Sequence, residues 1–214
     1  MSVLQHCYET TLWFTCQVPR PKVYDDDLRR RLIARAASVM AESGPNGLAL
    51  RPIAAAEGTS TTAVYSIFGG RAELIGEVSR TASSGFVAAQ RAVPVTDDPH
   101  VDLTNLGRAY RDWALANPTL YLVLMTSAEP GCYLEEPIPA SDAAEPLREA
   151  IVRLIAAGTF LPLDRDLMLA GIWASVHGFV SLELAGFFSP APRGQLDAMY
   201  EAQLESIARG WRTT

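Results

Sequence analysis

The sequence predicts an all-α protein, in which a small three-helix module precedes a larger helical domain. Long stretches rich in Ala, Leu, Arg and Glu carry apolar residues at spacings of three and four, the period of an amphipathic helix. Alternation of apolar and polar residues, the pattern of a half-buried strand, is scarce. With 49% hydrophobic residues, the 214-residue chain has enough apolar material for a sizeable core.

The first helix is expected to begin near Asp25, where three consecutive aspartates complement the positive end of a helix. One face of this helix is apolar and consists of Leu28, Leu32, Ala36, Val39 and Met40. Glycine and proline end it at Gly44, Pro45 and Gly47.

Two short helices follow, joined by a tight glycine turn. The first is expected from about Pro52 to Glu57, and Gly58 ends it. Thr59 or Ser60 can cap the second, which runs to about Phe68 before Gly69 and Gly70 stop it.

A longer connecting helix is expected from Arg71 to about Val93, and the PVTDDP stretch at 94–99 is the best domain boundary. Beyond it, proline-punctuated helices are predicted at 100–116, 118–128, 142–159, 165–188 and 194–210. The domains are therefore expected at 19–93 and 100–214.

Two short helices joined in this way form a helix-turn-helix when apolar residues hold the bend and the second helix exposes polar side chains. Short hydroxyls can bond phosphates or base edges, and a threonine methyl can contact a thymine methyl. The candidate DNA contacts are Arg51, Thr61, Thr62, Tyr65, Ser66 and Arg71. The alternative is a helical hairpin whose hydroxyls are merely solvated.

The run LALRPIAAAEGTSTTAVYSIFGGRAELI resembles the DNA-binding motif of the TetR family of bacterial repressors. Matching positions include Arg51, Gly58, Ser60, Tyr65 and Phe68. The sequence departs from the family pattern at Ala49, Glu57, Thr59, Thr62, Ala63 and Arg71. The resemblance implies that the six candidate residues contact operator DNA.

Charge and cysteine content fit this interpretation. Between Pro19 and Arg80, nine basic and seven acidic residues give a net charge of +2. Because the whole chain has a net charge of −6, the remaining residues carry a net charge of −8. This asymmetry suits an anion-binding module beside an acidic partner domain. The three cysteines match no metal site and indicate a reduced, cytoplasmic compartment.

Residues 1–18 resemble nothing in the family and have no helical period, so we expect a non-native or disordered extension. The alternative is a real arm that brings Arg20 and Lys22 to the DNA minor groove. No uninterrupted apolar run reaches the about 18 residues of a membrane span.

The second half resembles a TetR subgroup marked by a Trp-Ala-x-x-His-Gly signature, here Trp173, Ala174, His177 and Gly178. The resemblance implies a domain that binds a small effector and dimerises through its last two long helices. The candidate dimer face of the 165–188 helix comprises Leu167, Ala170, Ala174, His177, Val180, Leu184 and Phe187, and that of the last helix Met199, Leu204, Ile207 and Trp211. Packing within one chain accounts for some of these residues in either case. The candidate pocket residues are Tyr110, Trp113, Tyr121, Met125, Trp173 and His177, although core packing explains each singly.

The sequence lacks the G-x-S-x-G, P-loop, H-E-x-x-H and G-x-G-x-x-G motifs, so no enzyme, cofactor or metal site is expected. The predicted function is a dimeric transcription regulator, most simply a repressor, that binds a roughly palindromic operator and is released by a small molecule. The rival hypothesis is a helical ligand carrier or enzyme with a vestigial helix-turn-helix.

Overall fold

The computed structural model describes residues 26–126 and 142–213, and in these residues every regular element is helical apart from one isolated bridge between Phe160 and Arg212. The predicted all-α fold is thereby confirmed. The helices are α1 (Asp26–Ser43), η1 (Pro45–Gly47), α2 (Leu50–Ala56), α3 (Thr61–Phe68), α4 (Arg71–Arg91), α5 (Pro99–Ala116), α6 (Pro118–Thr126), η3 (Asp142–Ala144), α7 (Glu145–Ala156), α8 (Arg165–Leu184) and α9 (Arg193–Gly210). The predictions for residues 1–18 and for the three cysteines lie outside the described residues.

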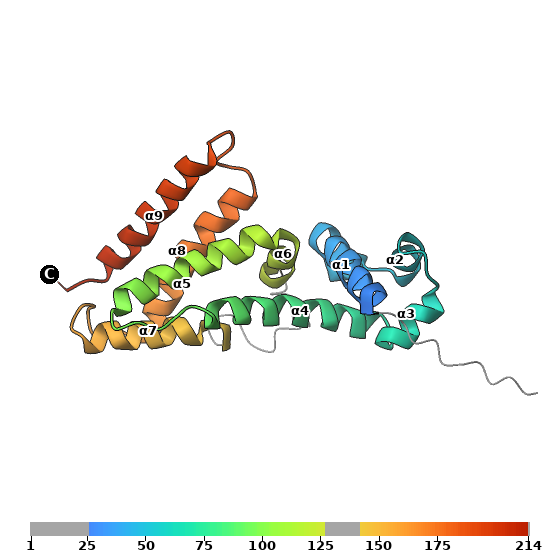
Figure 1. The fold of residues 1–214 in the computed structure, drawn as a ribbon, viewed down its shortest axis with the longest axis horizontal. Coiled ribbons are helices and arrows are strands. Elements are labelled where there is room, and N and C mark those ends of the chain that lie inside the picture. The colour runs from blue at the N-terminus through green and yellow to red at the C-terminus, as the bar shows by residue number, and fades with distance from the viewer. Residues whose placement is uncertain (1–25, 127–141, 214) are drawn as a thin grey trace, which may run out of the picture.

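Helix α4 runs along the molecule and joins its two ends (Figure 1). Helices α1 to α3 gather at one end, and α7 to α9 lie at the other. Helix α6 lies between them and packs against both α1 and α4. The larger half of the molecule is therefore joined to helices α1 to α3 through two elements, α4 and α6.

Apolar side chains form one continuous core from the N-terminal helices into the larger half. Leu32 of α1 and Val64 of α3 belong to the same cluster as Phe86 of α4 and Tyr121 of α6. A second cluster joins the start of α5 to α7, α8 and the end of α9, and includes Ile151 and Met168. The first cluster crosses the predicted boundary at 94–99, because α6 folds back onto α1.

The predicted helices agree with the structure to within a few residues. The first short helix begins at Leu50 rather than Pro52, so that Pro52 sits within its first turn, where a missing N–H costs nothing. Helix α8 ends at Leu184, four residues early, and Gly186 follows it with a φ of 77° that suits glycine.

Helix α8 carries an exposed apolar stripe that differs from the predicted one. Leu167, Ala170 and Ala174 of the predicted face are exposed, and Leu182 extends it. Val180 is fully buried and Leu204 on α9 is buried as well, so the prediction was wrong for these two residues. A step of three residues is shorter than one helical turn of about 3.6 residues. Successive members of the predicted set therefore lie progressively further around the helix, and some of them face the core. The observed stripe advances in steps near four and passes Gly178.

By length and composition α8 is apolar enough to cross a membrane. It packs against α5, α7 and α9, and its Glu183 pairs with Arg111 of α5. A helix that buries one face in a protein core and carries an apolar stripe on the other face is equally rich in apolar residues. Its composition therefore does not require a membrane.

Candidate nucleic-acid interface and effector cavity

The turn between α2 and α3 is built around Gly58. This residue has a φ of 66°, a conformation that side chains with a Cβ rarely adopt. The N–H of Gly58 donates to the carbonyl of Ala55 (3.2 Å), and the N–H of Thr59 donates to that of Ala54 (2.9 Å). These bonds satisfy the last carbonyls of α2 and fix the angle at which α3 leaves the turn.

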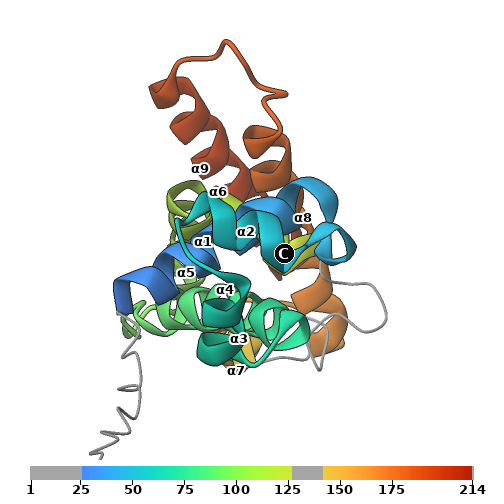
Figure 2. The ribbon, with the colours of Figure 1, turned by 90° about the vertical axis from the view of Figure 1, so that its right-hand side faces the viewer.

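Helix α3 separates into an inward and an outward face. The hydroxyl of Ser60 accepts a hydrogen bond from the N–H of Ala63 (3.2 Å), so Ser60 is the N-cap. Ala63 and Val64 are buried, while Thr62 and Ser66 are exposed. Figure 2 looks onto this end of the molecule.

Three of the predicted DNA contacts on α3 share the exposed face. Tyr65 is 56% exposed although it is a large aromatic residue, and it lies beside exposed Thr62 and Ser66. Thr61, half-buried, borders this face. Arg51 at the start of α2 is exposed as well. The structure thus offers hydroxyls, an aromatic ring and a cation to solvent at one end of the molecule.

Arg29 of α1 fixes the C-terminal end of α3. Its guanidinium donates to the carbonyl of Ile67 (3.3 Å), lies 4.9 Å from the centroid of the Phe68 ring and pairs with Glu77 of α4. Hydrogen bonds from Arg80 and Arg29 hold the pKa of Glu77 below its usual range. Because one side chain ties α1, α3 and α4 together, the exposed face of α3 has a defined orientation.

Arg71 has a structural role that the sequence did not indicate. Its Nε donates to the carbonyl of Leu48 (2.7 Å) and its Nη2 to that of Pro45 (2.6 Å). The side chain therefore braces the segment before α2 against the start of α4. Phosphate binding by Arg71 remains a prediction. Because Nε and Nη2 already donate to backbone carbonyls, a phosphate would have to bind the remaining N–H groups of the guanidinium.

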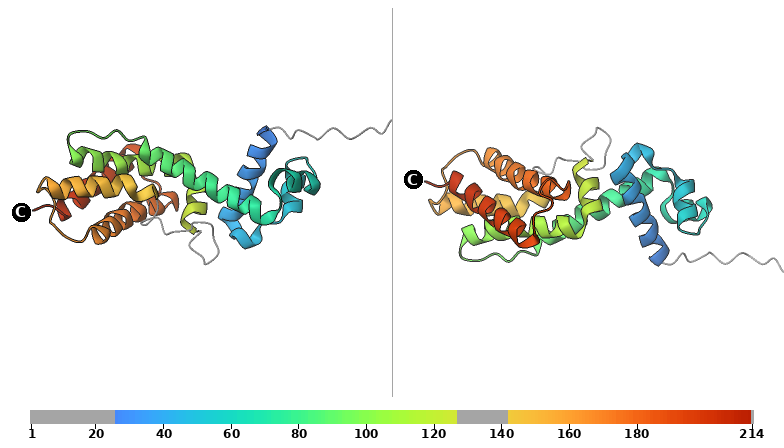
Figure 3. Two further views of the ribbon diagram at one scale, coloured as in Figure 1. Left: turned by 90° about the horizontal axis from the view of Figure 1, so that it is seen from below. Right: turned by 90° about the horizontal axis from the view of Figure 1, so that it is seen from above.

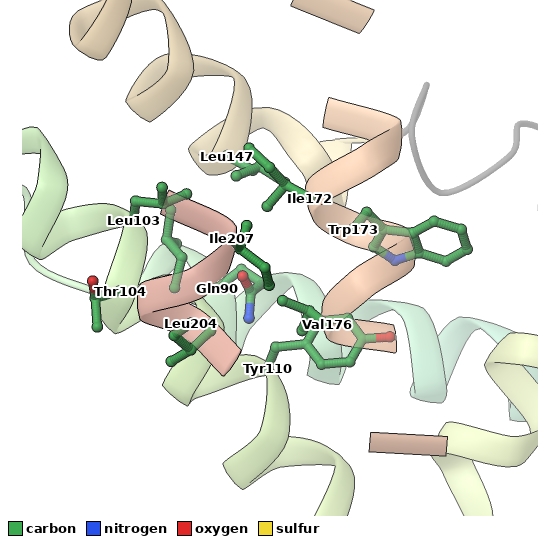
Figure 4. A pocket seen from close by; sticks show the side chains of 12 residues that line it. Gln90, Leu103, Thr104, Tyr110, Leu147, Ile172, Trp173, Val176, Leu204 and Ile207 are labelled. Carbon is green, nitrogen blue, oxygen red and sulfur yellow. The ribbon is translucent and has the colours of Figure 1, made fainter. Parts of the chain in front are cut away.

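A small cavity lies where five helices of the larger half meet (Figure 4). Its wall consists of Gln90 from α4, five α5 residues, and residues of α7, α8 and α9, namely Leu103, Thr104, Leu106, Gly107, Tyr110, Leu147, Ile172, Trp173, Val176, Leu204 and Ile207. The free space is about 40 Å³. None of these lining residues is charged.

Beside the cavity, hydroxyl groups surround His177 of α8. Its Nδ1 lies 2.8 Å from the hydroxyl of Tyr121 and 3.1 Å from that of Tyr110, and its Nε2 lies 3.3 Å from the hydroxyl of Ser181. The ring stacks on Trp173 with centroids 5.0 Å apart. Burial lowers the pKa of His177 and raises those of Tyr110 and Tyr121, so all three groups are neutral near pH 7.

Only part of the predicted pocket lines the cavity. Tyr110 and Trp173 do so, whereas Tyr121 and His177 form the polar cluster next to it. Met125 approaches the Tyr110 hydroxyl (4.0 Å), and Trp113 packs on Phe86 with centroids 5.3 Å apart. Gln90 and the aliphatic residues of the wall were missed, because a helix pattern does not reveal which core positions border a void.

The pH dependence of stability should report the neutral state of His177. Its lowered pKa means that the unfolded chain takes up a proton below about pH 6.5 while the native protein does not. The stabilisation is therefore complete above that pH and is lost as the pH falls through the native pKa. We expect the melting temperature of wild type relative to His177→Gln to fall between pH 7.5 and 5.5, with His100→Gln, outside the cluster, as the control. A constant difference would contradict this.

A helix-turn-helix with an exposed polar face, joined to a larger helical half, is the architecture of a DNA-binding transcription regulator. Residues 103–207 match the family model of the tetracyclin repressor-like C-terminal domain. The HTH-type transcriptional regulator Rv1816 of Mycobacterium tuberculosis is 29% identical over 221 residues, which cover 88% of this chain and 94% of the relative.

Solved structures agree with this match. A protein of unknown function from Rhodococcus sp. RHA1 superimposes with a TM-score of 0.65 at 26% identity, covering 91% of this chain and all of that one. A TetR family transcription regulator from Marinobacter aquaeolei VT8 shares the fold, with a TM-score of 0.73 at 19% identity over 89% of this chain and 98% of the other. In its family match, its relative and its fold, the chain is similar to TetR-family transcription regulators.

Proposed function

We propose that the protein is a dimeric repressor that binds a roughly palindromic operator and releases it when a small molecule enters the cavity. The exposed face of α3 carries this proposal, because hydroxyls and an aromatic ring are held outward by a capped helix that α1 fixes in place. Thr61 and Thr62 would read bases. Arg51, Tyr65, Ser66 and the free part of Arg71 would bind phosphates.

The apolar stripe on α8 supports a dimer. Helices α8 and α9 lie side by side away from the helix-turn-helix (Figure 3). Exposed Leu167, Ala174 and Leu182 on α8 and Met199 on α9 leave apolar surface that a second copy can cover. Two recognition helices would then read two half-sites.

The Trp-Ala-x-x-His-Gly motif supports membership of the subgroup that it marks. Trp173 and His177 are one turn apart and stack on each other between the cavity and the Tyr121 hydroxyl. In the subgroup proposal Trp173 of the motif forms part of the effector site's wall, and His177 holds the polar cluster beside it. We also propose that the protein acts in the cytoplasm, by binding and not by catalysis.

Effector release would work as a population shift. Helix α4 contributes Gln90 to the cavity and begins directly after α3, while α6 connects the same half to α1. A molecule in the cavity alters DNA affinity only if it binds one arrangement of these helices better than the other.

DNA binding tests this function directly, with fluorescence anisotropy on the promoter region of the protein's own gene and on a scrambled fragment. Wild type should prefer the promoter by at least about a thousandfold, and its affinity should fall steeply from 50 to 200 mM salt. We expect Thr62→Ala to cut that preference by about tenfold or more and to leave binding to the scrambled fragment unchanged.

Two controls make the test specific. Arg51→Ala should weaken binding to both fragments and reduce the salt slope by about one, as loss of a phosphate contact does. Ser84→Ala, on the exposed side of α4, should change neither quantity. A wild-type protein with no preference for the promoter would favour the helical carrier or enzyme instead.

A further inference from the structure

The cavity wall holds a polar group with no hydrogen-bond partner among residues 26–126 and 142–213. Gln90 is 6% exposed, and its Nε2 makes no hydrogen bond in this part of the chain. The Nε1 of Trp173, also in the wall, is likewise buried without a partner. Leaving a buried donor unsatisfied costs free energy, so each such donor calls for an explanation.

The position of Gln90 directs its amide into the cavity. Figure 4 shows this amide among Val176, Ile207 and Tyr110 at the meeting point of the helices. Tyr110 of the same wall makes no hydrogen bond to the Gln90 Nε2, and its hydroxyl lies 3.1 Å from His177 Nδ1 instead. The amide N–H is thus an unpaired donor in a wall that is mainly apolar.

The wall also excludes a charged ligand. Its twelve lining residues include no Asp, Glu, Lys, Arg or His. A carboxylate or ammonium group would lose its hydration there and gain no counter-charge, which is a large penalty. A neutral acceptor oxygen loses much less and can recover it from the Gln90 N–H.

We propose that the cavity binds an uncharged, mainly apolar molecule with an acceptor oxygen such as a ketone or ester, which the Gln90 amide recognises and the Trp173 indole can assist. This inference rests on the proposed function, since it specifies the effector class. It also makes Gln90 the residue through which the effector contacts α4 directly.

The small free volume adds a structural consequence. About 40 Å³ holds a few water molecules at most, whereas cavities that admit benzene measure about 150 Å³. The ligand must therefore separate the surrounding side chains as it binds. Binding therefore favours a more open packing of α4 against α5, α8 and α9 than the one described.

Three probes of similar size test the ligand class, namely acetophenone, ethylbenzene and benzoate. We expect wild type to bind acetophenone about fivefold more tightly than ethylbenzene, from one hydrogen bond, and benzoate at least about tenfold more weakly than acetophenone. Titrations followed by heteronuclear NMR should shift the side-chain amide signal of Gln90, which Gln90→Leu identifies by its loss.

The variant Gln90→Leu should bind both neutral probes equally, because its wall keeps its apolar character and loses the donor. Its melting temperature without ligand should rise by a few degrees, since an unsatisfied buried donor is removed. Gln203→Leu on α9, outside the cavity wall, should retain the preference of wild type.

The proposal would be overturned if wild type bound the ketone and the hydrocarbon equally, if it bound benzoate more tightly, or if it bound no probe at all. It would also be overturned if Gln90→Leu kept the preference of wild type. DNA binding measured on the same samples separates this from the function itself. A protein that binds its promoter specifically but fails these criteria loses only the effector class. A protein that meets them without specific DNA binding loses only the regulator function.

Discussion

Ala174→Arg should convert the protein into monomers and lower its affinity for a two-half-site operator by about a hundredfold to ten-thousandfold. Ala174 is exposed in the middle of the apolar stripe of α8, where two copies would meet. An arginine there places two unpaired charges in a desolvated interface. The loss of operator affinity is large because a monomer bound to one half-site no longer holds a second copy close to the other half-site at a high effective concentration.

Sedimentation velocity measures the first effect and anisotropy the second. Ala156, at the end of α7, is also exposed, and Ala156→Arg is the matched control that should remain dimeric. Affinity for a single half-site should be the same in all three proteins. A dimeric Ala174→Arg protein with full operator affinity would rule out the α8 stripe as the dimer interface.

Arg111→Met should lower the melting temperature by about 10 °C. The Arg111 guanidinium forms a bidentate pair with Glu183 (2.7 Å for both bonds), and the two side chains are only 7% and 6% exposed. It also bonds Asp197 (2.8 Å) and lies 5.0 Å from the centroid of the Tyr200 ring. Removing one partner leaves a buried carboxylate uncompensated, which costs about 3–5 kcal/mol, or about 10 °C in a chain of this length.

The same helix provides the control. Arg108 makes an equally good bidentate pair with Glu201 of α9 (2.8 and 2.7 Å), but its side chain and that of Glu201 are 47% and 46% exposed. Arg108→Met should therefore cost at most about 1 kcal/mol. Both melts are run at one protomer concentration, because a dimer couples stability to concentration. Similar shifts in the two variants would show that burial does not decide the strength of these pairs.

Local sequence signals predicted the helices well because each depends on near neighbours. Ser60 caps α3 as a serine before a helical run is expected to do, and Gly58 adopts the positive φ that ends α2. Positions on α3 followed from the helical period, since Val64 is buried whereas Tyr65, about 100° further around the helix, is exposed.

Long-range features did not follow from the sequence. The hydrogen bond from Arg71 to the carbonyl of Pro45 spans 26 positions, and nothing in either local pattern encodes it. The Arg111–Glu183 pair spans 72 positions. Gln90 looked like an ordinary polar residue near the end of a helix, and only the packing of five helices shows that its amide faces a void.

Because α4 is long, a small tilt of the helix at the cavity produces a larger displacement at its other end, next to α3. From Gln90 to Arg71 the helix covers about 29 Å, so a tilt of about 5° with its pivot at Gln90 displaces the start of α4 by about 2.5 Å. Hydrogen bonds to DNA tolerate only a few tenths of an ångström. In the proposed dimer, a tilt of this size in both protomers would suffice to bring the two α3 helices out of register with the operator.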